Sequence, residues 1–361
     1  MRRSAALVIS LNDAINLPSE ISTLSTSEKI RGVVPELDVR DAVGLVDAMA
    51  STTPFVVRGY VDDWPIVLAG NKSFKDLKDH ILGFYEGIKC NIFRGNQAGQ
   101  HHVFYDENMK LNFESTYEDL EEILDEMAAA SSQTPQPLMY SGSIPTRKNL
   151  PGFEAANALR IGERKMMCSL WMGTRSRVPI HSDYLDNFAC VAAGRRHVTL
   201  FPPEQFKNLY IGPLHYTPAS RPVSLVDLAD PDFEKFPLFE EALSSALQIT
   251  LEPGDILHIP SMWWHHIEGF SNFNVLVNFW WNEEKPALGS PELAMWHAIY
   301  AVRDLSPERK NFWLDMFNHY VFNADQKNFD HIENESQGVL KELDERAAGF
   351  VRNHLIRELS K

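Results

Sequence analysis

Two residues in the stretch VPIHSDYLDNF, positions 178–188, have the types and spacing suited to binding a metal ion. His181 and Asp183 are separated by one residue in a run that is otherwise apolar and aromatic. Alternate side chains of a β-strand point to the same face, so both groups would project into one space. A buried, ionised carboxylate needs a paired charge or a metal, because bare burial is very costly. The pair therefore predicts a cation with at least one further ligand.

A further ligand is available in the stretch EPGDILHIPSMWWHHIEGF, positions 252–270. Here a turn and a strand precede His265 and His266, and side-chain alternation allows only one of the two to face the ion. Two imidazoles and one carboxylate form the facial triad of non-haem Fe(II) oxygenases, which leaves positions open for other ligands. Zinc is the competing metal, but structural zinc sites favour cysteine, and no cysteine lies near these histidines. His101 and His102 lack a nearby third ligand, and we interpret them as loop or substrate-cleft residues.

The elements that must position these residues change in character along the chain. Residues 1–137 mix helical and strand-like runs, including an expected helix over 39–50 and an acidic helix over 115–130 that begins at a Ser/Thr cap. Residues 138–282 contain many short apolar runs separated by Pro, Gly, Asn and Asp, which predicts an antiparallel jelly roll. The stretch 203–245 is expected to be a long insertion between strands.

Residues 283–361 have a helical pattern, and two of the expected helices open with Ser-Pro. The pattern predicts a third helix with one apolar face formed by Val339, Leu340, Leu343, Ala347, Phe350, Val351, Leu355 and Leu359. We therefore predict a mainly β fold with flanking helices, in three parts: α/β elements over 1–137 that pack on the core, the jelly-roll core over 138–282 and a helical segment over 283–361.

Composition excludes several classes of partner. The formal charge is −15, from 34 basic and 49 acidic residues, and such a field disfavours general binding to nucleic acid or to anionic membranes. A local basic pocket for a small anion is still compatible with it. No apolar run is long enough to span a membrane, and the first sixteen residues lack a signal-peptide cleavage pattern. Three cysteines without a CxxC spacing fit reduced thiols, so we expect a cytoplasmic protein.

Two longer stretches, HSDYLDNFACVAAGRRHVTLFPPEQFKNLY and EPGDILHIPSMWWHHIEGF with the following NVLVNFWW, resemble the JmjC or cupin-like family of 2-oxoglutarate-dependent Fe(II) oxygenases. The similarity covers about residues 95–285, including VFYDENMKLNF at 103–113, and is greatest to the asparaginyl hydroxylases that inhibit hypoxia-inducible factor. The resemblance implies a double-stranded β-helix with Fe(II), 2-oxoglutarate and O2 as cofactor and cosubstrates. It assigns the metal ligands to His181, Asp183 and His265, and leaves His266 facing away as a hydrogen-bonded core residue.

The resemblance also suggests residues for the cosubstrate. The family places a lysine two residues after the glycine that ends the strand, which is Gly194 here, and this chain has Arg196 in that position. Arginine still offers a forked donor to a carboxylate. A family threonine that donates to the same carboxylate is replaced by Val178. Four other positions match family residues near the iron or the cosubstrate: Tyr140, Asn187, Asn278 and Trp280.

Three functional classes stay open from the sequence. The first is hydroxylation of a C–H bond on a protein or peptide side chain, and the second is the same chemistry on a small molecule or the demethylation of a methylated residue. The third is a non-catalytic cupin-like binding protein, against which the intact triad argues. A triad fixes the oxidant and not the molecule that is oxidised. The resemblance further implies a homodimer formed through the C-terminal helices.

Overall fold

The structure is a computed structural model that describes residues 26, 28–97, 99–162, 164–218, 221–282 and 288–361. The N-terminal run that we expect not to be a signal peptide lies outside these residues. The chain divides into two compact units, of which the first ends at Asn282 and the second runs from Glu283 to Lys361. Every helix within the described ranges is too short or too polar to cross a lipid bilayer.

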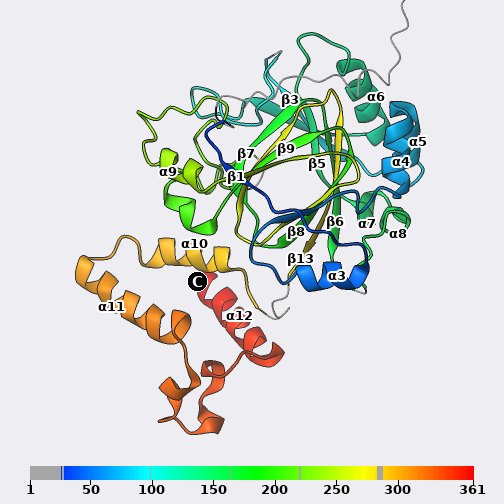
Figure 1. Cartoon of the computed structure of the whole chain (residues 1–361). Coiled ribbons are helices and arrows are strands. Elements are labelled where there is room, and N and C mark those ends of the chain that lie inside the picture. The colour runs from blue at the N-terminus through cyan, green and yellow to red at the C-terminus, as the bar shows by residue number, and fades with distance from the viewer. Residues whose placement is uncertain (1–25, 27, 98, 163, 219–220, 283–287) are drawn as a thin grey trace, which may run out of the picture. The chain divides into compact units, whose positions relative to one another are not determined.

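The first unit is built mainly from two β-sheets, and this confirms the predicted fold class (Figure 1). The first sheet has the strand order β1-β10-β9-β12-β7, with bounds Gly32–Val33, Leu247–Leu251, Arg196–Phe201, Trp264–Gly269 and Ser176–Ser182. The second has the order β2-β11-β8-β13-β6-β5-β3-β4, with bounds Phe55–Val57, Ile256–Ile259, Asp186–Ala193, Asn274–Trp281, Met167–Gly173, Met139–Pro145, Cys90–Gly95 and Phe113–Glu118.

Several consecutive strands of the core alternate between the two sheets, as in a jelly roll. β7 and β9 lie in the first sheet and β8 between them lies in the second; likewise β12 lies in the first and its neighbours β11 and β13 in the second. Alternate side chains of each strand fill the space between the sheets. Val198 and Leu200 of β9 pack there in one apolar cluster with Leu251 of β10, Val191 of β8 and Leu276 of β13.

Each sheet has its outer face covered. Helices α4 (Pro65–Lys72), α5 (Phe74–Leu82) and α6 (Leu120–Ala130) contribute to a cluster with the outward side chains of the second sheet. The 203–245 insertion, which includes α9 (Phe239–Ser244), covers the first sheet through a cluster that contains Phe201 and Leu209. Figure 1 shows α4, α5 and α6 gathered on one side of the strands and α9 on the other. Helices and the insertion therefore shield the outer faces of both sheets, and the interior between the sheets is left to hold a functional site.

Local details of two predicted helices were wrong. The acidic helix does not begin at a Ser/Thr cap, because residues 113–118 pair with β3 as strand β4 and the helix is capped by the Asp119 carboxylate, which accepts from Glu121 N. The helix expected over 39–50 is α3, Ala42–Ala48, capped by Asp41. In both cases a short-range carboxylate cap satisfies a free backbone N–H of the first turn.

The second unit is helical, with α10 (Pro291–Ala301), α11 (Pro307–Phe317) and α12 (Glu345–Leu359) joined by a π-helical turn and 3₁₀ turns. Val339, Leu340 and Leu343 precede α12 instead of lying on it, since Asp344 caps the helix through Ala347 N. Few residues of this unit are buried among those described; they are Phe329, Gln337 and Ala348.

Candidate metal centre

Strands β7 and β12 bring two of the predicted ligands face to face. His181 pairs with His265 in the antiparallel register, and the register shifts between His265 and Ile267. Pro179 lies in β7 beside this irregularity, where a missing N–H costs no ladder bond. Because of the shift, both His181 and Val178 can face the barrel interior although they are three residues apart.

The third predicted ligand, Asp183, follows directly after β7. One ligand atom each from His181, Asp183 and His265 lies within 4.8 Å of the other two, and the two imidazole centroids are 4.3 Å apart. His265 is buried, and His181 and Asp183 are half-buried, so one side of the group is open. Among the residues that the structure describes, this is the one set of His, Cys, Asp and Glu side chains with such a geometry.

Hydrogen bonds to the backbone orient both imidazoles. His181 Nδ1 donates to the Pro179 carbonyl over 2.8 Å, and His265 Nδ1 donates to the Trp263 carbonyl over 3.0 Å. Each bond fixes the proton on Nδ1 and leaves the Nε2 lone pair for a metal, which is the arrangement found around metal-binding histidines. Two imidazole nitrogens, one carboxylate oxygen and an open side fit a ferrous ion that keeps positions for other ligands.

Burial keeps His265 in its metal-binding form. The pKa of His265 is lowered to about 4, first by burial and second by the neighbouring His181, while Asp183 acts in the opposite direction. A neutral imidazole is the form that coordinates a metal, so no proton has to be displaced from His265 at neutral pH.

Two side chains contact the Asp183 carboxylate. Trp280 Nε1 donates to Oδ2 over 3.3 Å, and Arg221 Nε lies 3.7 Å from Oδ1 with its guanidinium 4.7 Å from the centroid of the Tyr184 ring. The family resemblance predicts Trp280 as an apolar wall of the pocket, but the sequence gives no signal for Arg221. That arginine lies within the 203–245 insertion, far from each ligand in sequence, and only the fold brings it to Asp183.

Arg196 is the most unusual side chain of the barrel interior. It is 2% exposed, its Nε has no hydrogen-bond partner, and no carboxylate of the described residues pairs with its guanidinium. Burial lowers its pKa to about 10, so the group is still charged at neutral pH. A buried, unpaired cation is strongly unfavourable, and an incoming carboxylate would relieve it.

Tyr140 lies beside Arg196, and the two affect each other's ionisation. Burial raises the pKa of Tyr140 to about 12, and the Arg196 charge acts against this rise. Arg196 lies opposite Gly269 on β12, four residues along the strand from His265, a separation of about 13 Å at the usual rise per residue. A long arginine side chain and an extended five-carbon diacid could bridge that distance together. The structure thus brings Tyr140 and Arg196 together at one end of the interior and the triad at the other.

The two predicted asparagines bind each other. Asn278 Nδ2 donates to Asn187 Oδ1 over 2.7 Å, and both are buried. Trp171 of β6, for which the sequence gives no signal, has its ring centroid 6.1 Å from that of Tyr140 and 5.8 Å from that of Trp280. Its buried Nε1 has no hydrogen-bond partner in the described part of the chain. Tyr140, Trp171 and Trp280 therefore form an aromatic wall inside the barrel.

His266 faces away from the triad, on the side of β12 opposite His265. The expectation that it is a hydrogen-bonded core residue was wrong, because neither ring nitrogen has a partner among the described residues. It is buried near His102, Arg177 and Asp227, and burial lowers its pKa well below the usual value. His102 is also buried on this outer side, beneath the insertion, and not in an open substrate cleft.

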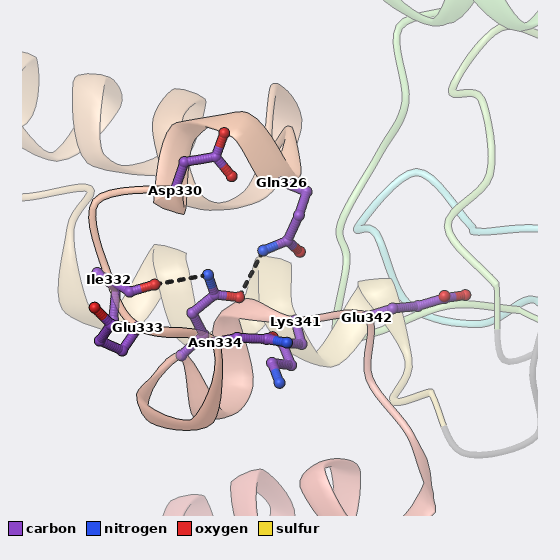
Figure 2. Close-up of a pocket in the computed structure, with 8 residues that line it drawn as sticks. Gln326, Asp330, Ile332, Glu333, Asn334, Lys341 and Glu342 are labelled. Carbon is purple, nitrogen blue, oxygen red and sulfur yellow. Dashed lines mark hydrogen bonds between the residues drawn. The ribbon is translucent and has the colours of Figure 1, made fainter.

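A pocket of about 650 Å³ lies in the second unit, but its chemistry is different (Figure 2). Gln326 donates to Gln337 Oε1 over 2.7 Å, and Gln337 Nε2 donates to the Ile332 carbonyl over 3.0 Å. The remaining lining is polar: Asp330, Glu333, Asn334, Lys341 and Glu342. No histidine or cysteine lines it, so the metal-binding pattern belongs to the barrel.

Comparison with known proteins identifies the family. A family model described as a cupin-like domain matches residues 44–286, which is more than half of the chain. Human HSPB1-associated protein 1 is 30% identical over 158 residues, covering 43% of this chain and 32% of that protein. Lysine-specific demethylase JMJ31 of Arabidopsis thaliana is 37% identical over 114 residues, covering 31% and 20%.

A third relative is tRNA wybutosine-synthesizing protein 5 of Gallus gallus, 37% identical over 101 residues, which are 28% of this chain and 29% of that protein. The matches cover a third or less of the length of these relatives. A relative from Dictyostelium discoideum carries the name JmjC domain-containing protein F. With the two-sheet fold, the His-Asp-His group and the match over residues 44–286, the chain belongs to the cupin-like family of JmjC type.

Proposed function

We propose that the chain is an Fe(II)- and 2-oxoglutarate-dependent dioxygenase that hydroxylates an unactivated C–H bond on a protein or peptide side chain. The observation that carries the proposal is the presence, in one barrel interior, of the triad His181, Asp183 and His265 and of the unpaired, buried Arg196. A structural zinc site would need no such cation. A dioxygenase needs it, because its cosubstrate has a carboxylate at each end.

His181, Asp183 and His265 would hold the ferrous ion, and Arg196 with Tyr140 would receive the distal carboxylate of 2-oxoglutarate. When bound, iron with 2-oxoglutarate and O2 supplies the oxidising power to convert R–H to R–OH, while 2-oxoglutarate becomes succinate and CO2. The protein orients the ligands through the two backbone carbonyls, excludes water with the aromatic wall and presents the substrate at the open side of the triad.

The substrate class is the least constrained part of the proposal. Demethylation of a methylated residue and oxidation of a small molecule are the alternatives, and the name of one relative, a lysine-specific demethylase, supports the first of them. The charge of −15 weighs against general binding to nucleic acid or to a membrane, which keeps a protein or peptide as the first choice. The three buried, free cysteines are in keeping with a reducing compartment, and we place the protein in the cytoplasm.

The test uses the full chain loaded with Fe(II) under anaerobic conditions. On admitting O2 with 2-oxoglutarate we expect succinate to form, and a panel of peptides and metabolites should raise its rate. A gain of one oxygen in the mass of a peptide supports hydroxylation, whereas release of formaldehyde identifies demethylation. Absence of both iron binding and 2-oxoglutarate binding would overturn the proposal in favour of a non-catalytic cupin-like protein.

We further propose that the second unit pairs with a second copy of the chain. Its large apolar side chains are mostly exposed, among them Tyr300 at 84%, Phe322 at 73% and Phe350 at 64%, while few of its described residues are buried. A helical segment with so small a core of its own needs another surface to cover it. Light scattering should give the mass of a dimer for the wild type and of a monomer for Phe350→Glu with Ile356→Glu; a monomeric wild type would contradict dimerisation.

A further inference from the structure

The strand that carries His181 has an incomplete edge. On one side β7 pairs with β12 along its length. On the other side, the described residues form two isolated bridges with it, one between Arg177 and His102 and one between His181 and Val223. A strand edge without a continuous neighbour is prone to local opening. His181 and Asp183 therefore depend on two short contacts from segments distant in sequence.

Backbone hydrogen bonds form both contacts. At the first bridge Val103 N donates to the Arg177 carbonyl over 3.1 Å, and Arg177 N donates to the His101 carbonyl over 2.6 Å. At the second bridge Ser224 N donates to the Ile180 carbonyl over 2.8 Å. Each contact has at most two such bonds, so neither is strong by itself.

One carboxylate connects the two contacts. Asp227, three residues after Ser224 in the insertion, accepts from Arg177 Nη1 over 2.9 Å through Oδ1, and its Oδ2 lies 3.8 Å from His102 Nδ1. Oδ1 also accepts from Ala229 N over 3.0 Å, which orients the carboxylate. The Arg177 side chain is 16% exposed and the Asp227 side chain 37%, so the ion pair is partly shielded from solvent.

We propose that Asp227 is a positioning residue for the metal centre. Asp227 holds β7 between the insertion and the 101–104 segment and so fixes the positions of His181 and Asp183. This inference rests on the proposed metal site. Asp227 does not itself belong to the triad; it acts through Arg177, which lies four residues before His181 on the same strand. Metal ligands must be held to within about 0.5 Å of the productive geometry, and partners that orient them raise affinity.

The first experiment measures binding of Co²⁺ alone to the full-length, metal-free protein through the d–d absorption bands. Asp227→Asn keeps the shape of the side chain and removes the charge; we expect about tenfold weaker binding. The matched control is Asp232→Asn, whose carboxylate caps Glu234 N and Lys235 N within the same insertion. The control should bind Co²⁺ as the wild type does, and thermal melting should show similar stability for both variants.

A double-mutant cycle tests the route through Arg177. If Asp227 acts through Arg177, then Arg177→Gln with Asp227→Asn binds Co²⁺ no more weakly than the worse single variant. Equal Co²⁺ affinity of the wild type and Asp227→Asn would overturn the inference, as would additive losses in the double variant.

Hydrogen exchange separates this inference from the proposed function, because it needs no metal. In the metal-free protein, Asp227→Asn should speed exchange of the backbone N–H groups of 176–178 and 180–182 by several-fold relative to Asp232→Asn. Unchanged exchange of these β7 amides refutes the positioning role of Asp227 even if the protein binds metal. Failure of the wild type to bind Co²⁺, with faster exchange in Asp227→Asn, would instead refute the metal site and support the role of Asp227 in holding β7.

Discussion

His265 and His266 are neighbours in sequence, yet they lie on opposite faces of β12 in two different environments. His265 faces the barrel interior, where a backbone carbonyl fixes its tautomer and another imidazole and a carboxylate lie within 4.8 Å. His266 faces the outer side, where neither ring nitrogen has a partner among the described residues. Both are buried, and burial lowers both pKa values.

The difference shows that burial and a perturbed pKa do not mark a functional histidine by themselves. What distinguishes the inner face is convergence: one possible ligand atom each from His181, Asp183 and His265 lies within 4.8 Å of the other two. The outer faces hold buried histidines too: His258 packs among aromatic rings, and His197 Nδ1 is hydrogen-bonded to the Thr250 hydroxyl. We therefore expect substitutions on the inner face to change ligand binding and those of the packed outer-face histidines to change stability. Asp227 is the exception on the outer side, because it acts on the ligand strand through Arg177.

The largest expected effect is loss of the metal. His181→Ala or Asp183→Ala removes one of the three proposed metal ligands, so bound iron should fall to background and succinate formation by roughly a thousandfold or more. His266→Gln, one position from His265, should retain iron at the wild-type level, as measured by elemental analysis of the loaded protein. Iron loss in His266→Gln equal to that in His181→Ala would remove the distinction between the two faces.

Arg196 should show opposite effects on binding and on stability. Arg196→Met removes the proposed partner of the cosubstrate carboxylate, and we expect about 500-fold weaker 2-oxoglutarate binding by calorimetry on Mn²⁺-loaded protein. The same substitution removes a buried, unpaired charge, so the free protein should melt at a higher temperature. Arg196→Lys keeps the charge and should lose less affinity. Unchanged affinity in Arg196→Met would mean that another basic group receives the carboxylate.

The sequence predicts the inner face better than the outer one, for a physical reason. The spacing of His181 and Asp183, with a turn, a strand and a histidine pair further on, follows from the two-residue period of strands, and so does the separation of His265 from His266. The jelly roll follows from the density of short strands. Both signals are visible in short stretches of sequence, because they depend on the two-residue period of β-strands.

What could not be predicted depends on long-range contacts. Arg221 and Asp227 reach the ligand strand from the insertion, and nothing in their sequence neighbourhood distinguishes them from other surface charges. The absence of a hydrogen-bond partner for His266 is equally invisible in the sequence. Helix starts were missed where one carboxylate decides them, as Asp119 and Asp344 do.

Acid should destabilise the outer faces. His258 is packed against Phe55, Phe188 and Trp281, with ring centroids 4.7, 5.3 and 5.7 Å away, and burial lowers its pKa to about 4. In the unfolded chain the pKa of a histidine is near 6.5. The stabilisation that the neutral His258 imidazole contributes to the folded state is therefore complete above pH 6.5 and is lost as the pH falls toward 4. The loss amounts to about 3 kcal/mol in the free energy of unfolding.

The measurement is urea denaturation of wild type and His258→Phe at pH 7 and pH 4. The variant keeps an aromatic ring in the cluster, so it should lose about 3 kcal/mol less than the wild type on acidification. His331→Phe, which replaces an exposed imidazole, should follow the wild type. Identical acid sensitivity of His258→Phe and the wild type would show that this outer-face histidine does not govern stability.

The smallest expected effect on metal binding separates Trp280 from Trp171, two residues of the aromatic wall. Trp280 Nε1 donates to Asp183 Oδ2, whereas Trp171 Nε1 has no partner among the described residues. Trp280→Phe should therefore weaken Co²⁺ binding about fivefold, the equivalent of roughly 1 kcal/mol for one hydrogen bond. Trp171→Phe, the same change one ring away, should leave Co²⁺ affinity unaltered and raise the melting temperature slightly, since it removes an unsatisfied buried donor. If both variants lose the same affinity, the aromatic wall acts on the metal site through packing, and convergence of hydrogen bonds is not what sets the inner face apart.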